Sequence, residues 1–145
     1  MNKQLVTLLS GLALVGVIAA CSSGEKKESD ESSSSAATTS SGPAAGGKVI
    51  VVKLITDGTS NRFEPNDIEA HKGDVIRYTL GIGVHNVHFL PDSNPGKSGL
   101  PPASEMLQLP GQTYDLPVTF APGKYYFQCD PHALLGMTGH LEVED

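Results

Sequence analysis

Four possible metal ligands give the clearest chemical signal in this sequence. Cys129, His132 and Met137 lie within nine residues of one another near the C-terminus, and His85 lies well upstream. A thiolate, two imidazoles and a thioether form a soft donor set. Two His and one Cys with a weak axial Met is the ligation of a blue-copper electron-transfer site. The residue types therefore predict a mononuclear copper site.

The spacing of these residues supports the same interpretation. The pattern Cys-x2-His-x4-Met fits one tight loop that closes over a metal from the end of a strand, and His85 supplies the remaining ligand from another part of the fold. Each His alone would be interpreted as a surface or core imidazole, and Met137 alone as a core residue. Their joint spacing favours ligation by His85, Cys129, His132 and Met137.

The same residues carry a resemblance to a known family. The pair His85-Asn86, the run Tyr126-Phe127-x-Cys129-x-Pro131-His132 and the run Gly136-Met137-x-Gly139 resemble the plastocyanin family of cupredoxins over residues 48–145. The resemblance implies an all-β fold, the cupredoxin Greek-key β-sandwich, and one copper ion that cycles between Cu(I) and Cu(II). It also implies that Asn86 hydrogen-bonds near the Cys sulfur and ties the two ligand loops together.

The sequence departs from the family pattern at several positions around the site. Gln128 stands where plant and algal plastocyanins usually have Tyr, Asp130 where Ser is common, and Val84 where a Pro usually precedes the first His. The contact made by the residue after the Cys is therefore uncertain from the family alone, and a photosynthetic role does not follow. The layout is more similar to the lipidated relatives halocyanin and auracyanin.

The N-terminal segment predicts export and anchoring. Residues 1–20 have a short basic start and an apolar run that is short for a membrane span, as in a secretory signal. The run ends in Ile18-Ala19-Ala20-Cys21, which resembles the lipobox of lipoproteins, in which the Cys is acylated. An ordinary cleaved signal with an incidental Cys, or an uncleaved anchor, is the alternative. We expect an exported lipoprotein on the periplasmic or extracytoplasmic face of a membrane.

The cysteine count fits this interpretation. The sequence has two Cys, so a lipidated Cys21 leaves Cys129 without a disulfide partner. Metal ligation would explain an unpaired thiol in an exported protein, whereas the alternative is a buried structural thiol.

The rest of the chain divides into a tether and one domain. Residues 21–47 are mainly Ser, Ala, Gly and charged residues and predict a disordered tether. Residues 48–145 are typical of a β-sandwich, with short strands separated by Pro and Gly turns. We expect a largely buried strand at 48–55, an extended segment at 63–68, and further strands at 75–80, 84–90, 114–120, 125–129 and 140–143. In the 114–120 strand, Pro117 indicates an edge position.

Composition narrows the possible functions. From residue 48 onward, seven Lys and Arg stand against twelve Asp and Glu, with no basic stripe for nucleic acid. Five His are too few for a multicopper oxidase cluster, and one Cys in the loop is too few for a binuclear copper centre, so we expect no enzyme. A monomeric one-electron carrier with transient redox-protein partners is the main hypothesis. Copper storage or delivery is the alternative. The apolar loop residues Ala133, Leu134 and Leu135 are the candidate docking surface around His132.

Overall fold

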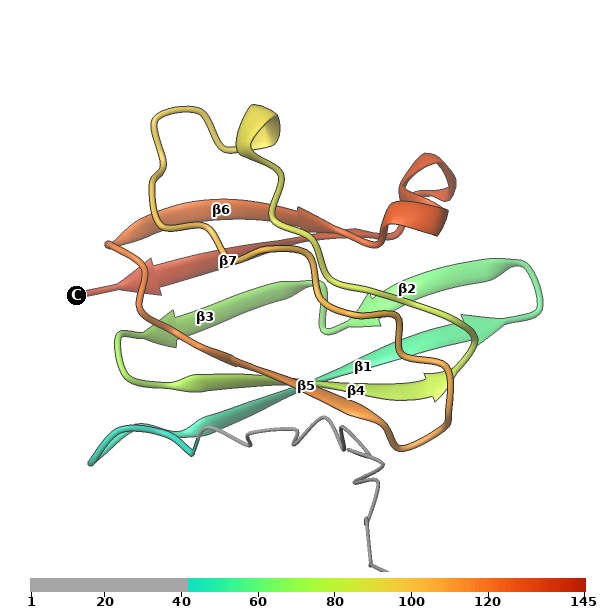
Figure 1. The fold of residues 1–145 in the computed structure, drawn as a ribbon, viewed down its shortest axis with the longest axis horizontal. Helices are drawn as coiled ribbons and strands as arrows, with labels where there is room; N and C mark the ends of the chain where they lie inside the picture. Colours follow the sequence, from blue (N-terminus) through green and yellow to red (C-terminus); the bar gives the residue numbers. More distant parts are fainter. Residues whose placement is uncertain (1–41) are drawn as a thin grey trace, which may run out of the picture. The chain divides into compact units, whose positions relative to one another are not determined.

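A computed structural model describes residues 42–145, and these residues form two packed β-sheets (Figure 1). One sheet has the strand order β2-β1-β4-β5 and the other has the order β3-β7-β6. The strands and the two short 3₁₀ helices are β1 (Val49–Asp57), β2 (Ser60–Glu64), β3 (Asp67–His71), β4 (Val75–Ile82), η1 (Pro91–Ser93), β5 (Thr113–Pro117), β6 (Gly123–Gln128), η2 (Asp130–Leu135) and β7 (Thr138–Glu144). This confirms the predicted all-β sandwich.

The chain crosses between the sheets repeatedly. It changes sheet between β2 and β3, between β3 and β4, and between β5 and β6. As a result β1 pairs in parallel with β4, and β3 pairs in parallel with β7, while the other neighbours are antiparallel. β5 ends the first sheet, so Pro117 lies on an edge strand, as predicted.

An aromatic cluster forms the centre of the core. The Phe127 ring, which is fully buried, contacts Phe63 at 4.9 Å, Phe89 at 5.3 Å and Tyr78 at 5.8 Å between ring centroids. The Cys129 side chain, also fully buried, lies two residues further along the chain, directly after the end of β6. The core therefore fixes the strand end from which the ligand loop departs.

Several strand predictions differ from the structure. The strand expected at 114–120 ends at Pro117, and the extended segment at 63–68 is divided between β2 and β3 in different sheets. β1 is covered on one face only: Val52 and Leu54 are buried, but Val51 is 51% exposed, because within residues 42–145 no third layer covers the outer side of its sheet. The segment 84–90 is not a continuous strand. It makes isolated bridges at His85 to Leu107 and at His88 to Gln128, because it leaves one sheet and reaches the other within a few residues.

The N-terminal predictions fall mostly outside this part of the chain. The signal at 1–20, the lipidation site Cys21 and most of the tether at 21–47 lie outside the described residues. The last tether residues are described, and there the Ala44 N–H donates to Gly73 O at 3.0 Å. No helix within residues 42–145 is long and apolar enough to cross a membrane.

Candidate metal centre

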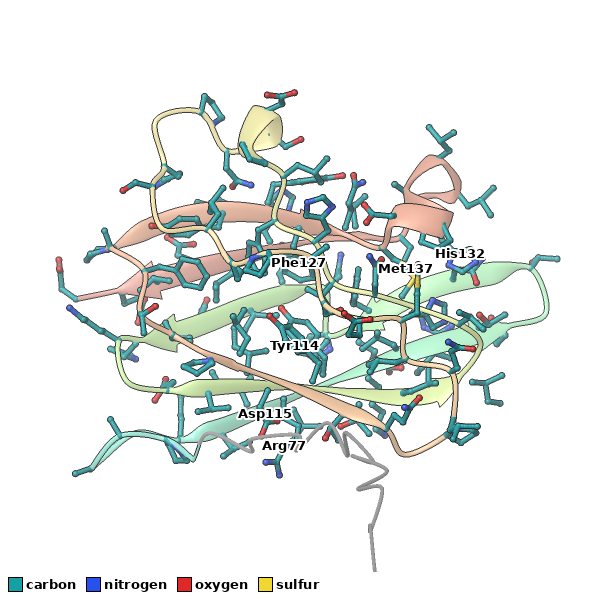
Figure 2. All side chains as sticks on the ribbon, viewed as in Figure 1. Arg77, Tyr114, Asp115, Phe127, His132 and Met137 are labelled. Atoms are coloured by element: carbon teal, nitrogen blue, oxygen red, sulfur yellow. The ribbon has the colours of Figure 1, made fainter. Side chains whose placement is uncertain are left out.

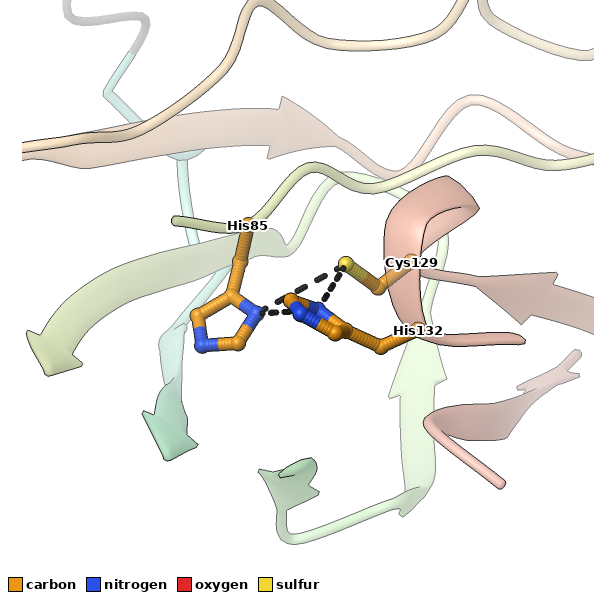
Figure 3. Close-up of side chains that lie close together, drawn as sticks. All are labelled: His85, Cys129 and His132. Carbon is orange, nitrogen blue, oxygen red and sulfur yellow. Dashed lines mark hydrogen bonds between the residues drawn. The ribbon is translucent and has the colours of Figure 1, made fainter. Parts of the chain in front are cut away.

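Three of the predicted ligands meet at one end of the sandwich (Figure 3). The Nδ1 atoms of His85 and His132 are 3.2 Å apart. Cys129 Sγ lies 3.3 Å from His132 Nδ1 and 3.6 Å from His85 Nδ1. His85 and Cys129 are fully buried, whereas His132 is partly exposed. Among the described residues this is the only cluster of His, Cys, Asp and Glu with metal-site spacing.

The spacing of the three donor atoms fits a metal ion. A point in their plane lies about 2 Å from each of them, which is a normal bond length from a first-row metal to an imidazole nitrogen. Two neutral imidazoles and one thiolate are also the donors that copper prefers. The residues present therefore fit the copper ion that the sequence predicts.

The loop that carries Cys129, His132 and Met137 closes on itself through its backbone. Cys129 N–H donates to Met137 O, Met137 N–H donates to His132 O, and His132 N–H donates to Cys129 O, all at 3.0–3.1 Å. Gly136 ends η2 with a φ of 87°, a left-handed conformation that glycine adopts without strain. This turn brings Met137 back beside the strand end.

Met137 occupies the position expected for a ligand-loop residue. Its side chain is fully buried, and Figure 2 shows it at the same end of the sandwich as His132. Its role as an axial ligand remains a prediction.

Burial shifts the pKa values of the two buried predicted ligands, His85 and Cys129, in opposite directions. Burial lowers the pKa of His85, although the contact with Ile82 O opposes this shift, so the ring is neutral near pH 7. Burial raises the pKa of the Cys129 thiol, although backbone N–H groups of Asn86 and His132 oppose this shift. Cys129 must therefore lose its proton to act as a ligand, and metal affinity should fall as the pH falls.

Asn86 ties the two ligand segments together, as the resemblance implies. Its Nδ2 donates to Asp130 Oδ2 at 2.8 Å, and its Oδ1 accepts from the Asp130 N–H at 2.8 Å. The resemblance did not predict what the residue after the Cys contacts, because this chain has Asp130 where Ser is common. In the structure Asp130 contacts Asn86. Its carboxylate also lies 3.0 Å from His88 Nδ1 and accepts from Gln128 Nε2 at 3.0 Å.

The sequence interpretation missed the role of His88 and Gln128 in this network. The one signal in the sequence was the charged Asp130 directly after Cys129, because a carboxylate at that position can accept hydrogen bonds from side chains near the ligand loop. The bridge between His88 and Gln128 supplies these donors, but it forms only in the folded protein.

The candidate docking residues lie on η2, next to His132. Leu134 is fully exposed, Leu135 is 69% exposed, and Ala133 is partly exposed. The sequence interpretation did not include two further exposed apolar residues near the other ligand, Ile82 and Val84, which precede His85 in the chain. Both ligand segments thus carry apolar side chains that face solvent.

Comparison with known proteins identifies the fold family. The copper binding proteins of the plastocyanin/azurin family match residues 50–144. The chloroplastic plastocyanin of Oryza sativa subsp. indica is 39% identical over 84 residues, which cover 56% of this chain and 54% of that protein. The plastocyanin of Prochlorothrix hollandica is 32% identical over 98 residues, covering 66% and 72%. This chain thus spans about half the length of the rice relative that it matches.

Solved structures show the same similarity. A mutant plastocyanin of fern aligns with a TM-score of 0.53 and 27% identity, covering 65% of this chain and 99% of that one. An oxidised mutant of amicyanin aligns with a TM-score of 0.51 and 28% identity, covering 66% and 81%. These similarities confirm the predicted all-β cupredoxin sandwich.

Proposed function

Because this chain belongs to the plastocyanin/azurin family of copper-binding proteins, we propose that it is a one-electron carrier with a type 1 copper site. The convergence of His85, Cys129 and His132 on one point carries this proposal. The site holds one copper ion, which supplies a one-electron Cu(I)/Cu(II) couple. A carrier needs no substrate pocket, and the proposal includes no enzymatic activity.

Each part of the site has a role in the proposed transfer. The buried Cys129 and His85 keep water away from the inner side of the metal position, and the loop hydrogen bonds with the Asn86–Asp130 pair resist movement of the ligands. Cu(I) and Cu(II) prefer different coordination geometries. A rigid site would hold one compromise geometry for both, so the ligands would rearrange little during electron transfer. Met137 is the proposed weak axial ligand, which tunes the reduction potential.

His132 is the proposed point of electron entry and exit. It is the only one of the three clustered ligands with partial exposure in the described residues, and Ala133, Leu134 and Leu135 surround it along η2. A contiguous exposed apolar patch on a soluble domain often marks a partner site, whereas single exposed apolar residues do not. We therefore propose transient docking of redox-protein partners on this loop, which suits the small contacts of redox encounters.

A charge on this loop should slow electron exchange. We expect Leu134→Glu, and likewise Leu135→Glu, to slow electron exchange with the physiological partner several-fold, because a partner would have to desolvate the carboxylate. Val51→Glu is the matched control, since Val51 is 51% exposed on β1, away from the loop. Stopped-flow kinetics on folded, blue variants measure the effect. Wild-type rates for both loop variants would contradict docking at η2.

We also propose that the carrier is tethered to the outer face of a membrane through a lipid on Cys21. The supports are the apolar run of residues 1–20, the Ile18-Ala19-Ala20-Cys21 sequence and the polar composition of residues 22–47. Full-length protein should fractionate with membranes, and Cys21→Ala should release it or block its processing. Mass spectrometry of the mature N-terminus checks this, and an unmodified residue other than Cys21 at that end would contradict it.

A further inference from the structure

The outer nitrogen of the His85 ring is held by two oxygen atoms from different parts of the chain. His85 Nε2 lies 3.1 Å from the carbonyl oxygen of Ile82 and 3.1 Å from Oγ1 of Thr56. Ile82 is close in sequence, but Thr56 lies near the end of β1, 29 residues before His85. The opposite ring nitrogen, Nδ1, faces Cys129 and His132 (Figure 3).

The partners of Thr56 define which of these atoms carries a proton. The Thr56 hydroxyl donates to Asn61 Oδ1 at 2.7 Å, across the antiparallel pair of β1 and β2 in which Thr56 and Asn61 stand opposite each other. A hydroxyl has one proton, so Thr56 Oγ1 can only accept from His85. The Ile82 carbonyl can also only accept. His85 Nε2 must therefore be the protonated nitrogen.

We propose that Thr56 and Asn61 are positioning residues for the metal centre: they hold His85 as the Nε2–H tautomer with the Nδ1 lone pair directed at the copper position. The hydrogen bond on one imidazole nitrogen sets the state of the other nitrogen, which is how groups behind a metal ligand orient it. The β1–β2 hairpin, which contributes no ligand, thereby becomes part of the site. This inference concerns the same copper site as the proposed function and rests on it for the role of Nδ1.

Gly83 makes room for this arrangement. A Cβ on Gly83 would overlap both Thr56 Oγ1 and His85 Nε2, and its φ of 111° disfavours any side chain. The hydroxyl, the ring and the glycine backbone therefore pack directly against one another. The contact between Thr56 and His85 lies near the turn of the β1–β2 hairpin, where Thr56 is partly buried and His85 is fully buried.

The decisive measurement is made on the metal-free protein. Long-range ¹H–¹⁵N correlation spectra report which imidazole nitrogen carries the proton, at a pH well above the ordinary pKa of histidine. We expect wild-type His85 to be the Nε2–H tautomer. In Thr56→Val, which removes the hydroxyl but keeps the branched shape, we expect a detectable fraction of the Nδ1–H tautomer and a loss of copper affinity of roughly tenfold. Thr56→Ser should restore both properties.

Variants at Asn61 test separately whether the hydrogen bond from Thr56 to Asn61 sets the tautomer of His85. Asn61→Asp keeps an acceptor for the Thr56 hydroxyl and should behave as wild type. Asn61→Ala frees the hydroxyl to donate to His85 and should shift the tautomer in the same direction as Thr56→Val. Amide spectra establish that each variant is folded. An Nδ1–H tautomer in the wild type, or wild-type tautomer and affinity in both Thr56→Val and Asn61→Ala, would overturn the proposal. If the wild-type tautomer is as expected but the copper-loaded protein is not blue, only the proposed function fails.

Discussion

Replacing Cys129 with serine should abolish the intense visible absorption of the Cu(II)-loaded protein. That band arises from charge transfer between a thiolate and copper, and Cys129 is the only described cysteine and lies within 3.6 Å of both histidine Nδ1 atoms. The wild-type band should also bleach when ascorbate reduces the protein. Absorption spectra of the copper-loaded protein, before and after reduction, make the measurement.

Met137→Gln is the matched control for this result. The change affects the same loop and a residue that is also fully buried, but it replaces the proposed axial ligand instead of the thiolate. The colour should remain, and the reduction potential should fall, because a harder oxygen donor favours Cu(II). A colourless wild-type Cu(II) complex would contradict the type 1 assignment. An unchanged potential in Met137→Gln would show that Met137 is not at the metal.

Replacing Phe127 with alanine should cost a large part of the stability of the domain. The ring contacts Phe63, Tyr78 and Phe89 and fills the space left by the absent side chain of Gly139. Removing a buried phenylalanine ring typically costs about 3–5 kcal/mol, and a small domain has a free energy of unfolding of roughly 5–15 kcal/mol. Urea unfolding of the metal-free protein measures the loss.

Lys124→Ala provides the control on the same strand, because Lys124 is exposed and its removal should change stability by less than about 0.5 kcal/mol. A loss for Phe127→Ala smaller than about 1 kcal/mol would contradict the central role of the ring in the core. We also expect Phe127→Ala to bind copper more weakly in its folded fraction, because β6 positions Cys129.

Several features of the fold could be predicted from local patterns. The alternation of apolar residues in β7 predicts that Leu141 and Val143 point inward, and both are buried. The position of Pro117 predicts an edge strand, because proline lacks a donor for a central ladder. These predictions succeed because each depends on neighbours within a few residues of the chain.

Other features depend on where distant segments meet. The β-branched run at 48–55 predicts a largely buried strand, but Val51 is exposed because the number of layers is a property of the whole fold. The segment around His85 has the composition of a strand, yet it changes partner between Leu107 and Gln128. Strand composition does not specify with which other segments of the fold a given segment will pair.

The sequence alone determined that a donor set suited to copper is available, because donor chemistry belongs to residue type and the spacing from Cys129 to Met137 belongs to one short loop. The tertiary structure decided how that chemistry is held. It buried His85 while leaving His132 partly exposed, paired Asp130 with Asn86, and placed Thr56 behind the His85 ring. The physical reason is that a hydrogen bond between side chains requires atoms about 3 Å apart, and for residues on different strands the packing of the sheets sets that distance.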